Sequence, residues 1–133
     1  MIEASFSVYH RRASQLADAM KLCGDDLPGY ASAVALLAVH SAISYSDALL
    51  IGFGGTRPRG ENHGDAVAAL RRACTKARVD QNGIKHFQTL ISAKTDISYG
   101  EKRVDDETVN KLRTTAERFQ VWAERILKQR KGR

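Results

Sequence analysis

The chain has 133 residues, of which 43% are hydrophobic, so it can form one domain with one core but not two. Charged residues make up 27%, a share typical of folded domains and not of disordered chains. No apolar run reaches the roughly 18 residues of a membrane span, the first residues lack a signal-peptide pattern, and two cysteines make no disulfide framework. We therefore expect one cytoplasmic domain over 1–133, with reduced thiols and no membrane contact.

The charge balance favours an anionic partner. Lys and Arg number 21 against 15 Asp and Glu, which gives a formal net charge of +6 and a pI near 9.6. A basic surface permits binding to a polyanion such as RNA, or to a nucleotide, without requiring it.

The first half of the chain predicts two long helices. Only two prolines occur, no segment alternates like a strand, and Ala, Leu, Arg and Lys are frequent, so we predict an all-α fold. The first helix is expected over about 2–22, followed by a break over 23–29. Its apolar stripe consists of Phe6, Tyr9, Ala13, Leu16 and Met20. The second helix, over about 30–53, is the most apolar segment and should lie at the centre of a bundle.

The second half predicts a loop and two or three further helices. Five glycines and Pro58 between residues 52 and 64 indicate a loop. A helix should start near His63, a short one should span 83–93, and 94–100 should be a linker. The third helix should turn Val67, Leu70, Cys74 and Ala77 inward, and the fourth Ile84, Phe87, Leu90 and Ile91.

The last predicted helix begins near Asp105 and ends in a basic tail over 128–133, expected to be solvated and frayed. Its apolar stripe consists of Val109, Leu112, Ala116, Phe119, Ala123 and Ile126. The sum is a bundle of four to five antiparallel helices. Because the second and last helices carry more apolar surface than a small bundle covers, we expect a homodimer.

Most catalytic signatures are absent from the sequence. It has no zinc-protease motif, no paired cysteines and no nucleophile elbow, and its glycine loop does not continue as a P-loop. The four histidines do not have metal-ligand spacing, and no partner can be named for His10 or His86. We predict no metal site and no cofactor.

One segment, 56–65, combines residues that suit phosphate chemistry. Arg57 and Arg59 lie in the glycine-rich loop, Asn62 is a candidate N-cap, and His63 opens a helix. A helix start and arginine guanidinium groups both bind phosphate, and a histidine at the positive helix end should be neutral and able to act as a base. The alternative is a solvated basic loop with a surface histidine.

These groups suit metal-independent RNA cleavage. His63 would take the proton of a ribose 2′-hydroxyl, which then attacks the adjacent phosphate, and Arg57 would stabilise the growing negative charge. A second copy of the chain would have to supply the proton for the leaving oxygen.

The second helix adds polar candidates. His40, Ser44 and Asp47 fall within an arc of about 60° on an otherwise apolar helix, so they should face a cleft or a polar group, unless this is the solvent side. Asp47 is placed to orient His63 or to pair with Arg57. Tyr45 and Tyr99 are candidates for stacking on a base, against the alternative of half-buried core residues.

These segments resemble the HEPN domains (higher eukaryotes and prokaryotes nucleotide-binding). The resemblance lies in 44–50 on a long central helix, in Asn62-His63-Gly64 at the start of the next helix, and in 96–100 before a long amphipathic helix. It covers about residues 30–130.

The resemblance implies a helical bundle that dimerises and, in many members, a metal-independent RNase of a toxin–antitoxin or defence system. The family's motif is Arg, four to six residues, then His, and Arg57 and His63 have five residues between them. It also implies the alternative of a non-catalytic member that binds a nucleotide, or pairs with a nucleotidyltransferase-type or antitoxin partner. Ser44, Tyr45, Arg59, Asn62 and Tyr99 are then the candidate RNA-binding or nucleotide-binding residues.

Overall fold

A computed structural model describes residues 2–54, 63–100 and 103–131; for 2–4, 63 and 131 it describes the helical backbone alone. Within these ranges the helices are joined by short turns and there is no strand. The helices are α1 (Ile2–Gly24), α2 (Leu27–Gly52), α3 (His63–Ala77), α4 (Ile84–Ser92), α5 (Lys94–Tyr99) and α6 (Asp106–Lys131). The predicted all-α class is confirmed, and α3 starts where it was expected.

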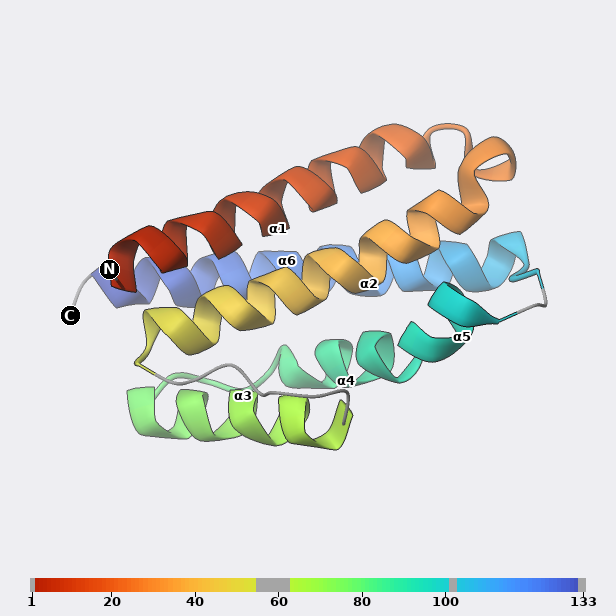
Figure 1. Ribbon diagram of the computed structural model, residues 1–133. Coiled ribbons are helices and arrows are strands. Elements are labelled where there is room, and N and C mark those ends of the chain that lie inside the picture. Colours follow the sequence, from red (N-terminus) through yellow and green to blue (C-terminus); the bar gives the residue numbers. More distant parts are fainter. Residues whose placement is uncertain (1, 55–62, 101–102, 132–133) are drawn as a thin grey trace.

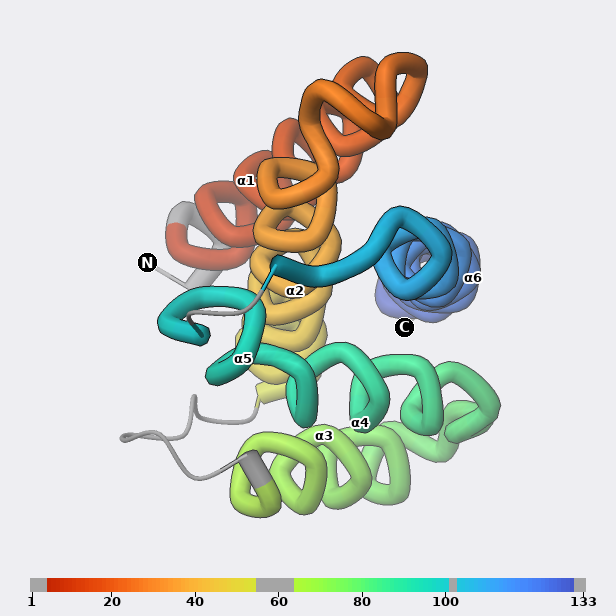
Figure 2. Tube along the Cα trace, turned by 90° about the vertical axis from the view of Figure 1, so that its right-hand side faces the viewer, coloured from red at the N-terminus to blue at the C-terminus, as the bar shows by residue number. Residues whose placement is uncertain are grey.

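The helices form a bundle around α2. Helices α1 and α2 form an antiparallel hairpin, and α6 lies along α2 in the same direction (Figure 1). Seen from the side in Figure 2, α4 packs below α2 and α6, and α3 lies below α4. The two termini are at the same end of the bundle (Figure 1). The prediction of antiparallel helices is therefore wrong for α2 and α6.

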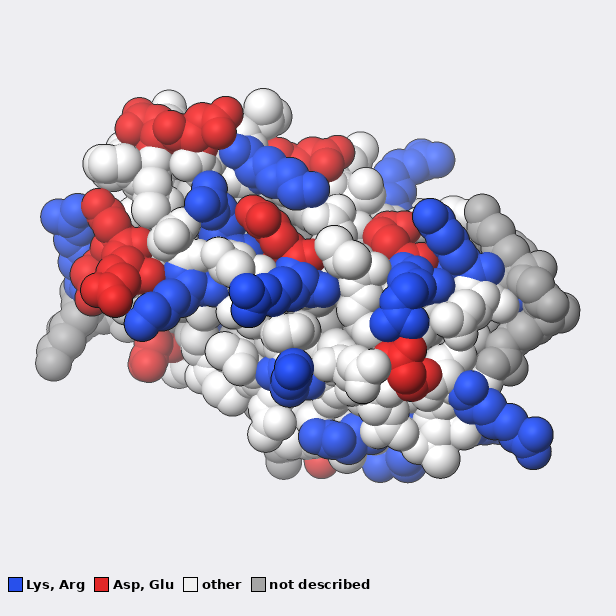
Figure 3. Space-filling model, turned by 180° about the vertical axis from the view of Figure 1, so that it is seen from behind, with Lys and Arg blue, Asp and Glu red and all other residues white. Residues whose placement is uncertain are grey.

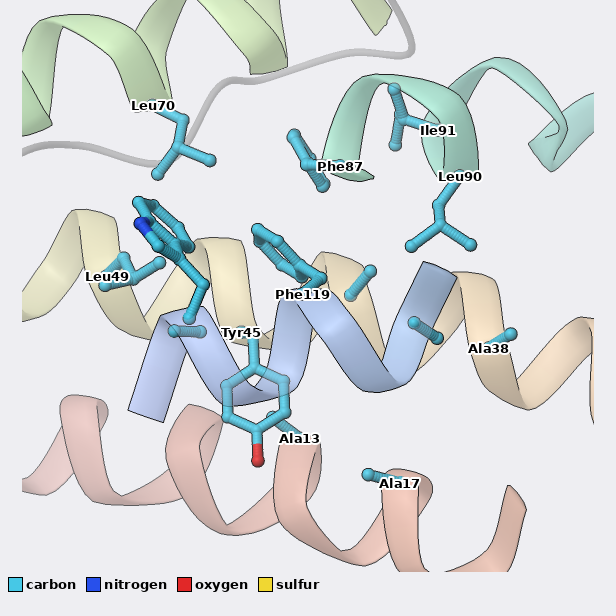
Figure 4. Close-up of a cluster of buried hydrophobic side chains, with 14 of the residues drawn as sticks. Ala13, Ala17, Ala38, Tyr45, Leu49, Leu70, Phe87, Leu90, Ile91 and Phe119 are labelled. Atoms are coloured by element: carbon cyan, nitrogen blue, oxygen red, sulfur yellow. The ribbon is translucent and has the colours of Figure 1, made fainter. Parts of the chain in front are cut away.

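The core contains the side chains that the apolar stripes predicted. Most buried hydrophobic residues form one cluster drawn from α1, α2, α3, α4 and α6, part of which Figure 4 shows. Its aromatic centre is a stack in which the Phe119 ring lies 5.5 Å from Phe87 and 5.6 Å from Trp122, between ring centroids. The predicted inward residues of α3, α4 and α6 are all buried. On α1, Leu16 and Tyr9 are only half-buried, and Ala17 is buried in addition.

Helix α2 has the composition of a helix surrounded by protein. It has no unbroken apolar run of 18 residues, but by length and mean hydropathy alone it is apolar enough to cross a membrane. However, 72% of its most apolar 18-residue stretch is buried inside the bundle. A helix that is apolar on all sides is expected at the centre of a helical domain as well as in a membrane.

The chain itself covers most of the apolar surface of α2 and α6. Among the described large hydrophobic residues of α6, only Val121 is exposed, and on α2 only Tyr30 and Leu36 are. The argument that these helices leave an uncovered stripe therefore does not hold. The homodimer stays a prediction without that support.

Two predicted boundaries are corrected. Residues 94–99 form the helix α5 instead of a linker, with Asp96 in its first turn and Gly100 closing it by donating its N–H to the Asp96 carbonyl at 3.0 Å. Helix α2 begins at Leu27, before the expected start, and Pro28 suits its first turn, where the missing N–H costs nothing. A kink at Tyr30, with φ −130° and ψ 22°, separates this first turn from the long helix, which begins near the expected residue.

The basic tail is also corrected. Helix α6 continues to Lys131, and Arg130 is anchored instead of frayed. The Arg130 Nε donates a hydrogen bond to the Gly52 carbonyl at 2.9 Å, and its guanidinium lies 4.1 Å from the centroid of the Phe6 ring. This side chain therefore ties the ends of α1, α2 and α6 together; residues 132–133 lie outside the described residues.

A carboxylate joins the turn between α3 and α4 to α6. The Asp80 oxygens accept hydrogen bonds from Trp122 Nε1 at 2.7 Å, Arg125 Nη1 at 2.7 Å and the backbone N–H of Asn82 at 3.1 Å. Gly83 packs so closely on the Trp122 indole that an added Cβ would overlap it. We call Asp80, Asn82, Trp122 and Arg125 the Asp80 clamp.

Candidate functional site

The predicted catalytic segment begins outside the described residues. Arg57, Arg59 and Asn62 lie there, and so does the side chain of His63, whose backbone is the first residue of α3. The first turn of α3 also carries Asp65. The roles of Arg57, Arg59, Asn62 and His63 therefore stay predictions, whereas the helix start at His63 is established.

The polar line on α2 runs from the surface into the protein. His40 is exposed, but Ser44 is 5% exposed and Asp47 is 8% exposed. The alternative that this line is a solvent face is therefore wrong for Ser44 and Asp47. Burial, and then the charge of Lys94, lowers the pKa of His40. Because a buried carboxylate is costly unless it is paired, Asp47 marks a polar position inside the bundle.

Basic residues and two surface cavities surround α3. The segment 63–92 contains five Lys or Arg against two Asp. A cavity of about 260 Å³ lies between the end of α2 and α3 and is bordered by Arg72 and Lys76. Another of about 310 Å³ lies between α3 and α4, bordered by Gly64 and Arg71. In Figure 3, the lower part of the molecule, where α3 and α4 lie, shows more Lys and Arg than Asp and Glu.

The two tyrosines have opposite surroundings. The Tyr45 ring is 1% exposed and lies in the core with its hydroxyl turned toward α1 (Figure 4), so the prediction that it stacks on a base is wrong for this conformation. Tyr99 on α5 is 78% exposed, so the half-buried alternative is wrong there and its ring faces solvent. Its role in stacking on a base stays a prediction.

The hydroxyl of Tyr45 belongs to a polar cluster that the sequence did not reveal. It donates to Glu124 Oε1 at 2.9 Å and accepts from Gln120 Nε2 at 3.1 Å. The same Glu124 oxygen lies 2.7 Å from His10 Nε2. Burial, and then the bond to Glu124, raises the pKa of Tyr45 well above its usual range, so the hydroxyl stays protonated. We call His10, Tyr45, Gln120 and Glu124 the His10 cluster.

The His10 cluster borders an open cleft of about 570 Å³ between α1 and α6. The side chains of His10 and Glu124 are each 34% exposed, so both contact solvent and the protein interior. The ring of His10 is also held at 5.5 Å from Phe6 and 6.2 Å from Tyr45, between centroids. Since His10 and Glu124 are 114 residues apart, only the fold brings them together.

The described part of the chain offers no metal cluster, and its buried cysteine, Cys74, is not placed for thiol chemistry. No group of three or more His, Cys, Asp or Glu in these ranges is arranged to hold a metal ion. Cys74 is buried, and burial, followed by the charge of Asp80, raises the pKa of its thiol to about 11. Such a thiol is a core residue and not a nucleophile at neutral pH.

Comparisons with known proteins do not assign the chain to a family: no protein-family model matches it, and no curated protein matches it.

Proposed function

We propose that the protein is a metal-independent RNase of the HEPN type, acting in the cytoplasm in a toxin–antitoxin or defence system. The observation that carries the proposal is the order of Arg57 and His63 before a helix that packs against the apolar central helix. Two features of the described chain support it. One is the buried Asp47 on α2, and the other is the excess of cations along α3 and α4, which suits an RNA backbone.

The reaction needs only side chains. His63 takes the proton of a ribose 2′-hydroxyl, the 2′-oxygen forms a bond to the adjacent phosphorus, and the bond from phosphorus to the 5′-oxygen breaks. Arg57 stabilises the charge on the phosphoryl oxygens, and Asp47 supports the pair. The leaving 5′-oxygen takes a proton from His63 of a second copy, which is why the proposal includes a homodimer.

A cleavage assay on mixed RNA in EDTA tests this mechanism. His63→Ala should lower the rate by roughly 10²- to 10⁴-fold, the usual contribution of a general acid or base. His40→Ala is the matched control, because His40 is exposed on α2, and it should cleave at the wild-type rate. Circular dichroism should show both variants folded. Cleavage by His63→Ala at the wild-type rate would contradict the assignment.

A non-catalytic binding module is the second candidate, and the cavities beside Arg71 and Arg72 favour it. It predicts that a nucleotide raises the melting temperature while RNA remains intact in EDTA. If RNA stays intact and no nucleotide changes the melting temperature, the remaining version of this candidate is a module that pairs with a nucleotidyltransferase-type or antitoxin protein.

A further inference from the structure

The cleft between α1 and α6 has a composition suited to a polar, anionic ligand. It is bordered by Ser7, His10, Arg11, Ser14, Gln120 and Glu124, together with Gln15. Its serines and glutamines can donate and accept hydrogen bonds, Arg11 is its permanent cation, and Glu124 is its carboxylate. Its volume of about 570 Å³ is within the range of pockets that hold small organic molecules. None of these residues belongs to the predicted RNase segment 56–65.

The bond from His10 to Glu124 fixes how the imidazole can act. Because a carboxylate accepts a proton, the Nε2 nitrogen at 2.7 Å from Glu124 carries the hydrogen. The neutral ring then presents Nδ1 as an acceptor. Within the described residues no hydrogen bond to Nδ1 is present, and the ring is one-third exposed beside the cleft. His10 is therefore oriented so that, in this tautomer, Nδ1 can accept a hydrogen bond from a ligand in the cleft.

The groups behind His10 are fixed before any ligand arrives. Glu124 Oε1 accepts from both His10 and Tyr45, and the Tyr45 hydroxyl accepts in turn from Gln120. The Tyr45 ring is locked in the core at 1% exposure. A site whose polar groups are already paired and held loses little order on binding. Tyr45 and Gln120 are thus positioning residues.

We propose that this cleft binds a small phosphorylated sugar, of the ribose 5-phosphate class, with Arg11 on the phosphate and His10 Nδ1 accepting a hydrogen bond from a sugar hydroxyl. An arginine guanidinium is suited to phosphate oxygens, and the serine hydroxyls and glutamine amides beside it suit a polyol. Glu124, already engaged with His10 and Tyr45, orients the ring instead of facing the phosphate.

The test is an NMR titration of the full chain with ribose 5-phosphate, following the His10 ring and the backbone of α1. The expected result is a saturable shift of His10, weakened roughly tenfold or more by Arg11→Gln, because a hydrogen bond to a charged group is lost. Arg12→Gln is the matched control: Arg12 is the neighbouring exposed arginine on α1, but it does not border this cleft. It should bind like wild type.

Two further measurements separate the parts of the proposal. Inorganic phosphate should bind more weakly than ribose 5-phosphate, and His10→Asn should reduce this difference without unfolding the chain. Equal binding of both ligands would overturn the hydroxyl contact, and no saturable shift up to about 10 mM ribose 5-phosphate would overturn the site. His63→Ala should bind ribose 5-phosphate normally, so failure of the proposed RNase and failure of this site are told apart.

Discussion

The Asp80 clamp and the His10 cluster are two carboxylate centres that both involve residues of α6 but have different partners. Asp80 and Glu124 have nearly equal side-chain exposure, 33% and 34%. Asp80 accepts from an arginine, an indole and a backbone N–H, none of which changes charge near neutral pH. Glu124 instead accepts from a histidine and a tyrosine, and this histidine also borders an open cleft.

The difference shows that exposure alone does not distinguish a structural carboxylate from a functional one. The donors of Asp80 join the α3–α4 turn to α6, so removing them should affect stability. Of the two donors of Glu124, His10 borders a cleft and Tyr45 lies behind it in the core, so removing their polar groups should affect ligand binding more than stability. The following variants test this division, from the largest expected effect on stability to the smallest.

Trp122→Ala should have the largest effect. The indole is 4% exposed, stacks on Phe119 and donates to Asp80, so its loss leaves a cavity and an unpaired acceptor. We expect the free energy of unfolding to fall by about 3–5 kcal/mol, measured by urea denaturation. Val121→Ala, at the adjacent and 70% exposed position, should change it by less than about 0.5 kcal/mol. Similar costs at the two positions would contradict the packing described.

Gly83→Ala should cost about 1–3 kcal/mol, because the added methyl group overlaps the Trp122 indole. The double variant with Trp122→Ala isolates the cause: once the indole is gone, the methyl group should cost much less. A cost that is unchanged in the Trp122→Ala background would mean that backbone conformation, and not the indole, requires glycine.

Asp80→Asn should reduce stability in a pH-dependent way. Its hydrogen bonds, above all to Arg125, lower the pKa of Asp80 to about 2, whereas an unfolded aspartate titrates near 3.9. The stabilisation by the carboxylate is therefore complete above about pH 4 and is lost as the pH falls toward 2. At neutral pH we expect a loss of about 1–2 kcal/mol, since the pair is partly exposed. Unfolding curves of both proteins at several pH values should converge in acid, and a constant difference would contradict this account.

Tyr45→Phe should cost the least, about 0.5–1.5 kcal/mol in urea denaturation. The ring keeps its core packing and only the hydrogen bonds to Glu124 and Gln120 are lost. The larger expected effect is on the cleft, where ribose 5-phosphate should bind more weakly because Glu124 and His10 are less well held. A large loss of stability with unchanged binding would reverse the roles assigned to the two carboxylate centres.

The helices could be predicted because their signals are local. Apolar spacing identified the inward faces of α3, α4 and α6, and the start of α3 followed from the glycine-rich segment and His63. The basic tail was misread because its exposure was inferred from charge alone. Arg130 contacts Phe6 and Gly52, both of which are far from it in the sequence, so no local pattern could reveal these contacts.

The candidate sites divide in the same way. The segment with Arg57 and His63 is contiguous, so sequence reasoning could propose it. The His10 cluster combines residues of α1, α2 and α6, which are far apart in the sequence. The one sign of it in the sequence is that Gln120 and Glu124 are four residues apart and so lie on the same face of α6. Tyr45 was singled out as a ring to stack on a base, whereas the fold uses its hydroxyl and buries its ring.

The most direct test of the central proposal is a comparison of RNA cleavage rates in EDTA for wild type, His63→Ala and Arg11→Gln. The account predicts cleavage at similar rates by wild type and Arg11→Gln, and roughly 10²- to 10⁴-fold slower cleavage by His63→Ala. The reason is that RNase chemistry is assigned to the Arg57–His63 segment and not to the α1/α6 cleft. Cleavage by His63→Ala at the wild-type rate, or intact RNA with the wild type, would contradict it.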